Sequence, residues 1–315
     1  MYHKRMLHFN NYAITGGVPS FITTIAMAFP EFEHVVCSLK EPEEYALIDY
    51  WRNMGIKYMH HNKITRDIVK DMGARIITLH NIRKNQREGR WSYDIFFDRA
   101  VIFFHHNQCI VPDPHHGASL HCYVSEYIKK TGFVYEPNIV MPPCVYEVPY
   151  LKINRPHREK PVIGRIQSQT CGKISDDMVR LLGEINGADT YTVGTGNAMN
   201  PIVPGKMPEH LQKIDMLAMW SNRVESWSMV TTEAMLSGIP VVAFNRCDGL
   251  AEQMRKSKGG LLVNTRQGFK EALQYLVDHP DKRKELGEIG RNWAVRNASS
   301  RYLRNRLIDK ILDWV

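Results

Sequence analysis

Short apolar runs alternate with longer segments of helical pattern through the first half of the chain. Two of these runs, Arg75–Leu79 and Ala100–Phe104, are largely apolar and bounded by polar segments. Such runs are typical of strands that a parallel sheet buries on both faces. The segments up to Phe29 and over Pro42–Met54 are predicted helices. Further strands are predicted at Met6–Asn10, His34–Leu39, Cys122–Val124 and Ile139–Met141.

A proline-rich stretch from Met141 to Pro161 interrupts this pattern, and the alternation then starts again. Proline lacks an amide proton and disfavours a helix before it, so this stretch is the predicted linker. The strands predicted after it are Val162–Ile166, Asp189–Val193, Pro240–Phe244 and Gly260–Val263. The predicted helices include Ser175–Asn186, a helix containing Thr231–Ser237, Phe269–Asp278, Asp281–Asn297 and a last helix that runs to Val315.

Repeated βα alternation in two halves predicts an α/β fold of two doubly wound, Rossmann-like domains facing a cleft. The N-terminal domain is expected to cover residues 1–148, and the last helix, 300–315, is expected to join it. The C-terminal domain is expected to cover residues 149–299. Ligands of such sheets bind at the carboxyl ends of the strands, so the cleft is the expected site.

Composition and charge narrow the class of protein. The 315 residues are 43% hydrophobic and 23% charged, which is ordinary for a globular protein and excludes a wholly disordered chain. No apolar run approaches the ~18 residues that span a bilayer, and we recognise no signal peptide. We therefore expect a cytoplasmic protein with reduced cysteines. Residues 151–315 hold 25 Lys and Arg against 18 Asp and Glu, which favours an anionic ligand or surface there.

Two glutamates, Glu225 and Glu233, flank a predicted helix start. Ser228 is the predicted N-cap, and the helix is expected from about Met229 to Ser237, with Gly238 as its stop signal. The first amides of a helix have no partner within it and lie at its positive end. The segment therefore predicts an anion site with an acceptor for sugar hydroxyls on either side of it.

This segment resembles the E-x7-E signature of retaining glycosyltransferases of family 4, which have the GT-B fold. The residues from Ala234 to Ala243, AMLSGIPVVA, are also similar to that family. The resemblance implies that Glu225 orients the donor sugar and that Glu233 binds the ribose. The family often has Gly-Phe-Gly where this chain has Ser226, Trp227 and Ser228, and these residues and Met229 are implied to lie at the donor phosphate.

Other segments follow in the order that this family has. Gly164 and Arg165, followed by Lys173, resemble the family's GR…K segment, which implies that Arg165 and Lys173 clamp the donor diphosphate. In this chain a glycine precedes Lys173, whereas the family usually has Lys-Gly. Asp215 begins the strand that leads to the first glutamate, and we expect a structural role for it.

The first half of the chain carries two further resemblances. Gly16 and Gly17 resemble the glycine-rich loop after the first strand, where the backbone can approach the donor phosphate or the acceptor. The segment 103–107, FFHHN, resembles the FH motif, whose histidine faces the donor sugar. His105 fits the spacing best, and His106 is the competing choice.

The resemblance implies retaining transfer of a hexosyl or pentosyl group from a nucleotide-diphosphate sugar, with a UDP-sugar favoured, to an acceptor hydroxyl. The leaving phosphate departs on the face that the acceptor attacks and takes its proton, so no protein nucleophile is needed. The sequence has no D-x-D pair and no zinc-ligand spacing. We therefore expect a metal-independent enzyme without a cofactor, in which fixed cations neutralise the leaving group.

Three alternatives stay open at this point. A nucleotide-sugar epimerase with the GT-B fold would release its product without an acceptor. The basic second half also suits a nucleic-acid-binding module, and the two ideas merge in a glycosyltransferase acting on modified DNA. The acceptor is thus a saccharide, a lipid-linked glycan or modified DNA, and a lipid acceptor implies peripheral contact with an anionic membrane surface.

Overall fold

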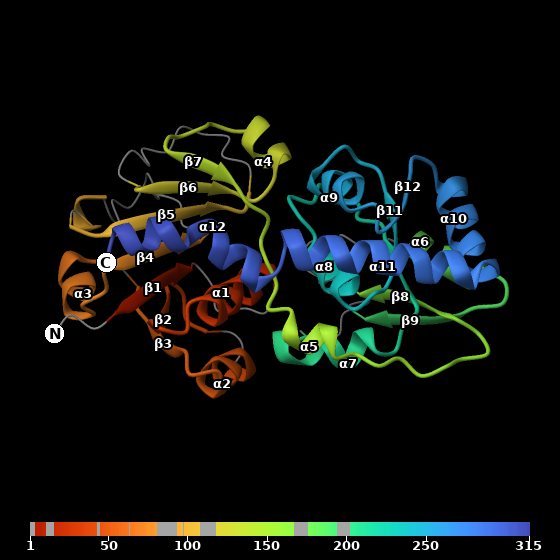
Figure 1. The fold of residues 1–315 in the computed structure, drawn as a ribbon, viewed down its shortest axis with the longest axis horizontal. Coiled ribbons are helices and arrows are strands. Elements are labelled where there is room, and N and C mark those ends of the chain that lie inside the picture. Colours follow the sequence, from red (N-terminus) through yellow and green to blue (C-terminus); the bar gives the residue numbers. More distant parts are fainter. Residues whose placement is uncertain are drawn as a thin grey trace. The chain divides into compact units, whose positions relative to one another are not determined.

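The computed structural model describes residues 4–10, 16–42, 45–62, 64–80, 93–96, 98–107, 118–166, 176–193 and 202–315. The chain divides into two compact units, each with a parallel sheet of its own (Figure 1). Unit 1 consists of Met1–Pro143 and Leu303–Val315. Unit 2 consists of Cys144–Tyr302.

Unit 1 is built on a seven-stranded parallel sheet with the strand order β3-β2-β1-β4-β5-β6-β7. The strands after β1 are added first on one side of it and then on the other, so the sheet is doubly wound. The strands are β1 Arg5–Asn10, β2 Glu33–Ser38, β3 Lys57–His60, β4 Ile76–His80, β5 Ala100–His105, β6 Leu120–Tyr123 and β7 Asn138–Val140. The helices are α1 Gly17–Ala28, α2 Tyr45–Asn53, α3 Arg66–Asp71, the 3-10 helix η1 Tyr93–Phe96, α4 Glu126–Lys130 and α12 Ser300–Asp313, which belongs to unit 1 from Leu303 on.

The two faces of this sheet differ in chemistry. Successive side chains of a strand point to opposite faces. Odd-numbered positions of the central strands, such as Leu7 and Phe103, fill an apolar core. Even-numbered positions include the buried polar side chains of His8, Thr78 and His80. The odd-numbered face is therefore apolar over most of the central strands, up to His105 at the end of β5, whereas the even-numbered face has buried hydrogen-bonding groups along its middle.

The last helix packs within unit 1. Arg304 on α12 donates hydrogen bonds to the carbonyl oxygen of Ala28 at 2.8 Å and to Glu31 at 2.9 Å. Its guanidinium also lies 5.3 Å from the ring centroid of Phe29. Figure 1 shows α12, in blue, beside α1 in red. These contacts fix the C-terminal helix to the end of the first helix of the chain.

Unit 2 contains a five-stranded parallel sheet with the order β12-β11-β10-β8-β9. The order reverses between β8 and β10, and ligands of doubly wound sheets bind outside the carboxyl ends of the strands at such a point. The strands are β8 Val162–Ile166, β9 Asp189–Val193, β10 Met216–Met219, β11 Val241–Phe244 and β12 Gly260–Val263. The helices are α5 Val148–Leu151, α6 Asp176–Gly183, the 3-10 helix η2 Pro204–Lys206, α7 Met207–Leu211, α8 Met229–Leu236, α9 Gly249–Ser257, α10 Arg266–Asp278 and α11 Pro280–Asn297.

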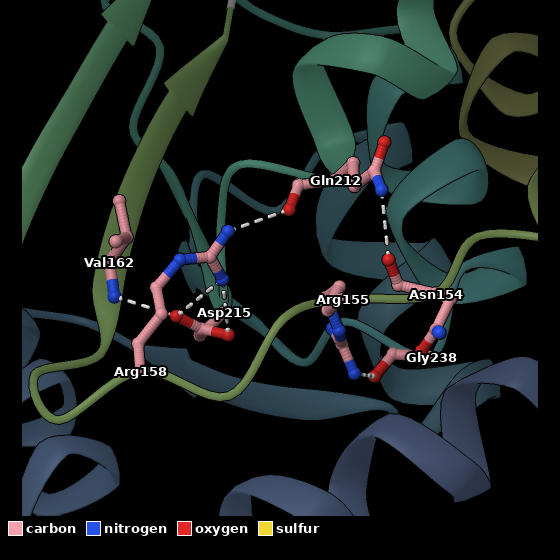
Figure 2. Close-up of polar contacts among 7 residues, drawn as sticks. All are labelled: Asn154, Arg155, Arg158, Val162, Gln212, Asp215 and Gly238. Atoms are coloured by element: carbon pink, nitrogen blue, oxygen red, sulfur yellow. Dashed lines mark hydrogen bonds and ion pairs between the residues drawn. The ribbon is translucent and has the colours of Figure 1, made fainter.

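The start of β10 is tied to the segment that leads into β8 (Figure 2). Arg158 Nη1 donates to the two carboxylate oxygens of Asp215 at 3.1 and 3.2 Å. The backbone N–H of Val162 donates to the same carboxylate at 2.9 Å, and Arg158 Nη2 donates to the carbonyl oxygen of Gln212 at 2.8 Å. Asp215 therefore has the structural role that the sequence predicts.

The predicted fold class is confirmed: the chain has an α/β fold with two parallel, Rossmann-like sheets. The sequence analysis missed β3, because Lys57–His60 forms the edge of the sheet and is at most half-buried, so it carries no apolar run. Every helix among the described residues is too short or too polar to cross a bilayer. The cleft expected between the domains stays a prediction.

Candidate functional site

Arg165 lies near the carboxyl end of β8, beside β10, where the strand order of unit 2 reverses. Its side chain is 0% exposed. Nη1 donates to the carbonyl oxygen of Ala218 at 3.3 Å, and Nη2 donates to that of Trp220 at 2.7 Å. The guanidinium therefore fixes the end of β10, the strand from which the chain continues toward Glu225.

The charge of Arg165 is coupled to that of Glu225. Burial lowers the pKa of Arg165 to about 10, and the negative charge of Glu225 acts in the opposite direction. Arg165 is thus protonated at pH 7. Glu225 is itself 8% exposed. The structure brings these two predicted site residues together at the carboxyl edge of the unit 2 sheet.

The helix start that the sequence predicts is confirmed. Ser228 is the N-cap of α8, and its Oγ accepts a hydrogen bond from the backbone N–H of Thr231 at 3.3 Å. The Thr231 hydroxyl donates to the same oxygen at 2.8 Å. A serine N-cap satisfies one of the first amides of a helix and leaves the amides before it directed out of the helix. The start of α8 can therefore donate hydrogen bonds to an anion.

Asp248, which the sequence analysis did not identify, fixes the loop before α8. Its carboxylate accepts from the backbone N–H of Glu225 at 2.9 Å and from that of Ala251, in the first turn of α9, at 3.1 Å. The N–H of Gly249 donates to the carbonyl oxygen of Glu225 at 2.8 Å. A Cβ at Gly249 would lie 1.8 Å from the carbonyl oxygen of Ser226, so only glycine fits there. The adjacent Asp-Gly pair is the signal that could have identified this contact.

Gln253 on α9 holds the first turn of α8. Its Nε2 donates to the carbonyl oxygen of Ser228 at 3.3 Å and to the hydroxyl of Thr232 at 2.8 Å. Its Oε1 accepts from the N–H of Ser228 at 3.3 Å. Gln253 is 0% exposed, so these bonds form in a dry environment. No local pattern in the sequence distinguishes this glutamine.

Glu233 lies one turn inside α8 and is 3% exposed. Its Oε1 accepts a hydrogen bond from the hydroxyl of Tyr150 at 2.9 Å. Burial raises the pKa of Glu233 to about 7, although the Tyr150 hydrogen bond acts to lower it. The two glutamates of the motif therefore lie in different environments: one beside a cation, the other beside a phenol.

The residues between the two glutamates do not all point the same way. Trp227 is 7% exposed; its Nε1 donates to the hydroxyl of Thr232 at 3.2 Å, and its ring stacks on Trp293 with centroids 6.3 Å apart. The indole is thus directed into unit 2. Ser226 and Met229 are half-buried.

Packing within unit 2 explains why residue 164 is a glycine. It lies in the middle of β8, and a Cβ there would lie 2.4 Å from Cδ1 of Ile214. The side chain of Ile214 therefore occupies the space that any larger residue would need. Lys173 lies outside the described residues, so the structure does not place this predicted cation.

The predicted site residues of unit 1 lie near the ends of its strands and helices. Gly16 is the N-cap of α1, with no atom of the described residues within 4 Å of where a Cβ would lie, and Gly17 is the first residue of that helix. His105 is the last residue of β5, is 3% exposed, and its Nε2 lies 3.0 Å from Nδ1 of His121 on β6. His106 is also buried, and it contacts a different set of side chains.

The described residues contain no group of three or more His, Cys, Asp or Glu side chains placed to hold a metal ion.

The second unit carries a recognisable family pattern. Residues 199–293 match the family model described as Glycosyl transferases group 1. This stretch contains Glu225, Ser228, Glu233, Asp248 and Gln253. Comparison with curated proteins gave no match.

Solved structures share the fold of the whole chain at low sequence identity. A glycosyltransferase from Rickettsia africae ESF-5 aligns with a TM-score of 0.73 at 14% identity, covering 100% of this chain and 99% of that one. Alr3699/HepE from Anabaena, solved in complex with UDP-glucose, gives a TM-score of 0.73 at 15% identity, covering 99% and 100%. WaaG, a glycosyltransferase involved in lipopolysaccharide biosynthesis, gives 0.66 at 11% identity, covering 97% and 99%. These similarities show a common fold.

Proposed function

We propose that this protein is a retaining glycosyltransferase that moves a sugar from a nucleotide-diphosphate sugar to an acceptor hydroxyl. One observation carries the proposal: the buried, positively charged Arg165 lies at the switch point of the unit 2 sheet, within electrostatic reach of Glu225. The match of residues 199–293 to a glycosyltransferase model supports it. Because the Anabaena protein of similar fold was solved with UDP-glucose and with UDP, we propose a UDP-sugar as the donor.

The leaving diphosphate is stabilised by fixed positive charge in this proposal. The amides at the start of α8 donate hydrogen bonds to it, and Lys173 supplies a mobile cation. Arg165 uses two donors to hold β10, so it acts on the diphosphate through its charge and through the position of the loop that follows. Groups fixed in advance in this way stabilise developing charge without reorganisation, which removes the need for a metal ion.

The two glutamates have separate roles. Glu225 orients the donor sugar, because its backbone is fixed at both ends by α9. Glu233 accepts from the ribose hydroxyls, and the Tyr150 hydroxyl fixes the position of its carboxyl group. Loss of Glu233 should therefore raise the donor KM more than it lowers kcat.

Unit 1 presents the acceptor hydroxyl in this proposal, with Gly16, Gly17 and His105 near the reacting groups. The acceptor is a saccharide, a lipid-linked glycan or modified DNA. The excess of Lys and Arg over Asp and Glu in residues 151–315 supports peripheral contact of a cytoplasmic enzyme with an anionic surface.

A panel of nucleotide sugars, each incubated with and without acceptors, tests the function. The expected result is release of UDP from one or a few donors, stimulated by an acceptor and insensitive to EDTA. Proton NMR of the product should show the donor's anomeric configuration. Interconversion of the sugar without an acceptor would identify an epimerase instead. Failure to bind any nucleotide would contradict the proposal.

Variants of the charged pair test the site itself. Arg165→Met and Glu225→Ala should each lower the rate by roughly 10²–10³-fold, the usual loss for one fixed electrostatic group. Glu285→Ala on α11 is the matched control, since that exposed carboxylate pairs with Lys282, one turn earlier on the surface of the helix. The transfer rate of this control should stay within about twofold of the rate of the original enzyme. An unchanged rate in Glu225→Ala would remove that residue from the mechanism.

A further inference from the structure

A line of buried polar side chains crosses the even-numbered face of the unit 1 sheet. It begins at the carbonyl oxygen of Phe29, which lies 2.8 Å from Nε2 of His34 on β2. Nδ1 of His34 lies 3.0 Å from Nε2 of His8 on β1. Nδ1 of His8 lies 2.7 Å from Oγ1 of Thr78 on β4. Three neighbouring strands thus contribute one side chain each to a continuous series of hydrogen bonds.

The series continues to the carboxyl edge of the sheet. Oγ1 of Thr78 lies 2.9 Å from Nε2 of His80, and Nδ1 of His80 lies 3.1 Å from Nε2 of His106. His106 follows the last residue of β5. Phe21 of α1 packs edge-on against the rings of both His80 and His106. We call His34, His8, Thr78, His80 and His106 the histidine chain; none of its members is more than 8% exposed.

The histidine chain has only one arrangement of protons when its four histidines are neutral. The Phe29 carbonyl can only accept, so His34 carries its proton on Nε2 and leaves Nδ1 as an acceptor. His8 must then donate from Nε2, and its bare Nδ1 receives the hydroxyl proton of Thr78. A neutral imidazole has one donor and one acceptor nitrogen, so each choice determines the next.

The same reasoning determines the proton positions at the His106 end of the histidine chain. The Thr78 oxygen, having donated its proton to His8, accepts from Nε2 of His80. Nδ1 of His80 then accepts from Nε2 of His106. His106 is left with a lone pair on Nδ1, at the edge of a doubly wound sheet where ligands bind. The Phe29 carbonyl, at the opposite end of the histidine chain, thereby determines that Nδ1 of His106 is an acceptor.

We propose that the histidine chain is a proton relay, in which Nδ1 of His106 takes the proton of a substrate hydroxyl and the positive charge comes to rest on His34. That this hydroxyl belongs to the sugar acceptor rests on the proposed function. In the relay His106 takes the proton that the sequence resemblance assigns to the leaving phosphate. Each proton moves by one hydrogen bond, from His106 to His80, to Thr78, to His8 and to His34. Every donor becomes an acceptor, no proton is lost, and no other reactant is needed.

His34 is the best resting place for the charge in this chain. Its imidazolium would donate to the Phe29 carbonyl and to the bare Nε2 of His8, so both N–H groups keep partners. Burial lowers the pKa of His34, but the Phe29 carbonyl and the negative charge of Glu31 act to raise it. Burial lowers the pKa of His8 and His80 well below the usual value, and that of His106 to about 3. The histidine chain is therefore neutral at rest, and a proton that enters it is least disfavoured on His34.

Histidine tautomers provide a test that needs no substrate. Nitrogen-15 NMR of the 315-residue protein, with labelled histidine, should show the Nε2–H tautomer at pH 7.5 for the four histidines of the histidine chain, His8, His34, His80 and His106. On acidification His34 should become doubly protonated, and the other three histidines should change together to the Nδ1–H tautomer. Independent titration of His106, without this joint change, would overturn the relay.

Thr78→Val removes the central hydroxyl and nearly preserves the side-chain volume. In this variant protonation of His34 should change the tautomer of His8 alone, and His80 and His106 should keep Nε2–H. Thr78→Ser, which restores the hydroxyl, should recover the joint change of all three. A joint change in Thr78→Val would show that the hydroxyl carries no proton.

Kinetics test the use of the relay in catalysis. Thr78→Val should lower kcat about 100-fold with the donor KM unchanged, and Thr78→Ser should stay within about threefold of the original enzyme. The rate in mixtures of H2O and D2O should curve downward for the original enzyme, because several protons move together. An unchanged kcat in Thr78→Val would overturn the catalytic role. If no nucleotide sugar reacts at all, the proposed function fails, and the NMR measurement alone decides on the relay.

Discussion

The carboxylate of Asp248 accepts a 2.9 Å hydrogen bond from the backbone N–H of Glu225, 23 residues earlier in the chain. The same carboxylate caps α9 through the N–H of Ala251. The loop before α8 is thus fixed by the neighbouring helix, in a position that its own sequence does not determine. This coupling makes the position of Glu225 depend on the start of α9.

Asp248→Ala should impair both stability and donor binding. The substitution removes an N-cap, which contributes about 1 kcal/mol, and leaves the buried N–H of Glu225 without a partner, which costs about 1–3 kcal/mol. We expect a loss of about 2–4 kcal/mol in the free energy of unfolding, measured with denaturant, and a raised donor KM. Thr265→Ala removes the N-cap of α10 in the same unit and is the matched control. It should lose about 1 kcal/mol and keep the original KM; an equal KM in the two variants would contradict the coupling.

Glu233→Gln should stabilise the protein at alkaline pH. The pKa of Glu233 is raised to about 7 by burial, so the folded state holds a proton that the unfolded state releases above its own pKa of 4.5. Stability is therefore lost as the pH rises from 4.5 through 7. Glutamine stays neutral and can still accept from Tyr150, so its gain should be on the order of 3 kcal/mol larger at pH 8 than at pH 4. Thermal unfolding of both proteins at the two pH values measures this difference. A gain that does not vary with pH would show that Glu233 ionises normally.

Gly164→Ala should destabilise unit 2 through overpacking. The added methyl group would meet the side chain of Ile214, and such crowding costs about 1–3 kcal/mol in a packed core. Ile214→Ala makes the required space, so the double variant should be more stable than the sum of the single losses predicts. A double-mutant cycle by denaturant unfolding tests this. Normal stability of Gly164→Ala with a raised donor KM would instead favour direct contact of this glycine with the donor.

Unit 1 should lose stability in mild acid before unit 2 does. Burial lowers the pKa of His8, His80 and His106, so these histidines are neutral in the fold and protonate in the unfolded chain below about pH 6.5. Each of them makes the free energy of unfolding fall by about 1.4 kcal/mol per pH unit as the pH drops. Unit 2 has three histidines, His157, His210 and His279, and none of them is fully buried. Burial lowers the pKa of the half-buried His210, so unit 2 should respond to acid, but less than unit 1.

Hydrogen exchange with mass spectrometry follows the two units separately. After correction for intrinsic exchange rates, peptides from β1 and β4 should lose protection between pH 7 and pH 5. Peptides from β10 and β11 should keep theirs. Equal loss in both units would show that the buried histidines do not determine the acid sensitivity.

Features that depend on neighbouring residues were predictable from the sequence. The start of α8 at Ser228 and its end before Gly238 follow from a capping hydroxyl and from a glycine with a φ of 68°. Both signals act within a few residues, so the chain order alone contains them. The parallel sheets were predictable for a similar reason, because strands buried on both faces are read from short apolar runs.

Contacts between distant residues were not predictable in this way. No sequence pattern joins Gln253 to Ser228, or Tyr150 to Glu233, because these pairs meet only when separate helices pack. The same holds for Gly164, whose packing partner is 50 positions away in the chain. Polar side chains of this kind leave no periodic pattern in the sequence, because each one bonds to a single partner, whereas periodicity marks a whole buried face.

The sequence by itself determined the two parallel α/β sheets, the capped helix α8 and the positions of the two motif glutamates along the chain, because each depends on local spacing. Tertiary structure alone decided that His8 lies opposite Thr78 in the register of β1 and β4, and that Arg165 holds β10 beside Glu225. The physical reason is that strand register and helix packing bring together residues far apart in the chain. A buried polar group has no water to bond to, so its partner determines its charge and the positions of its protons.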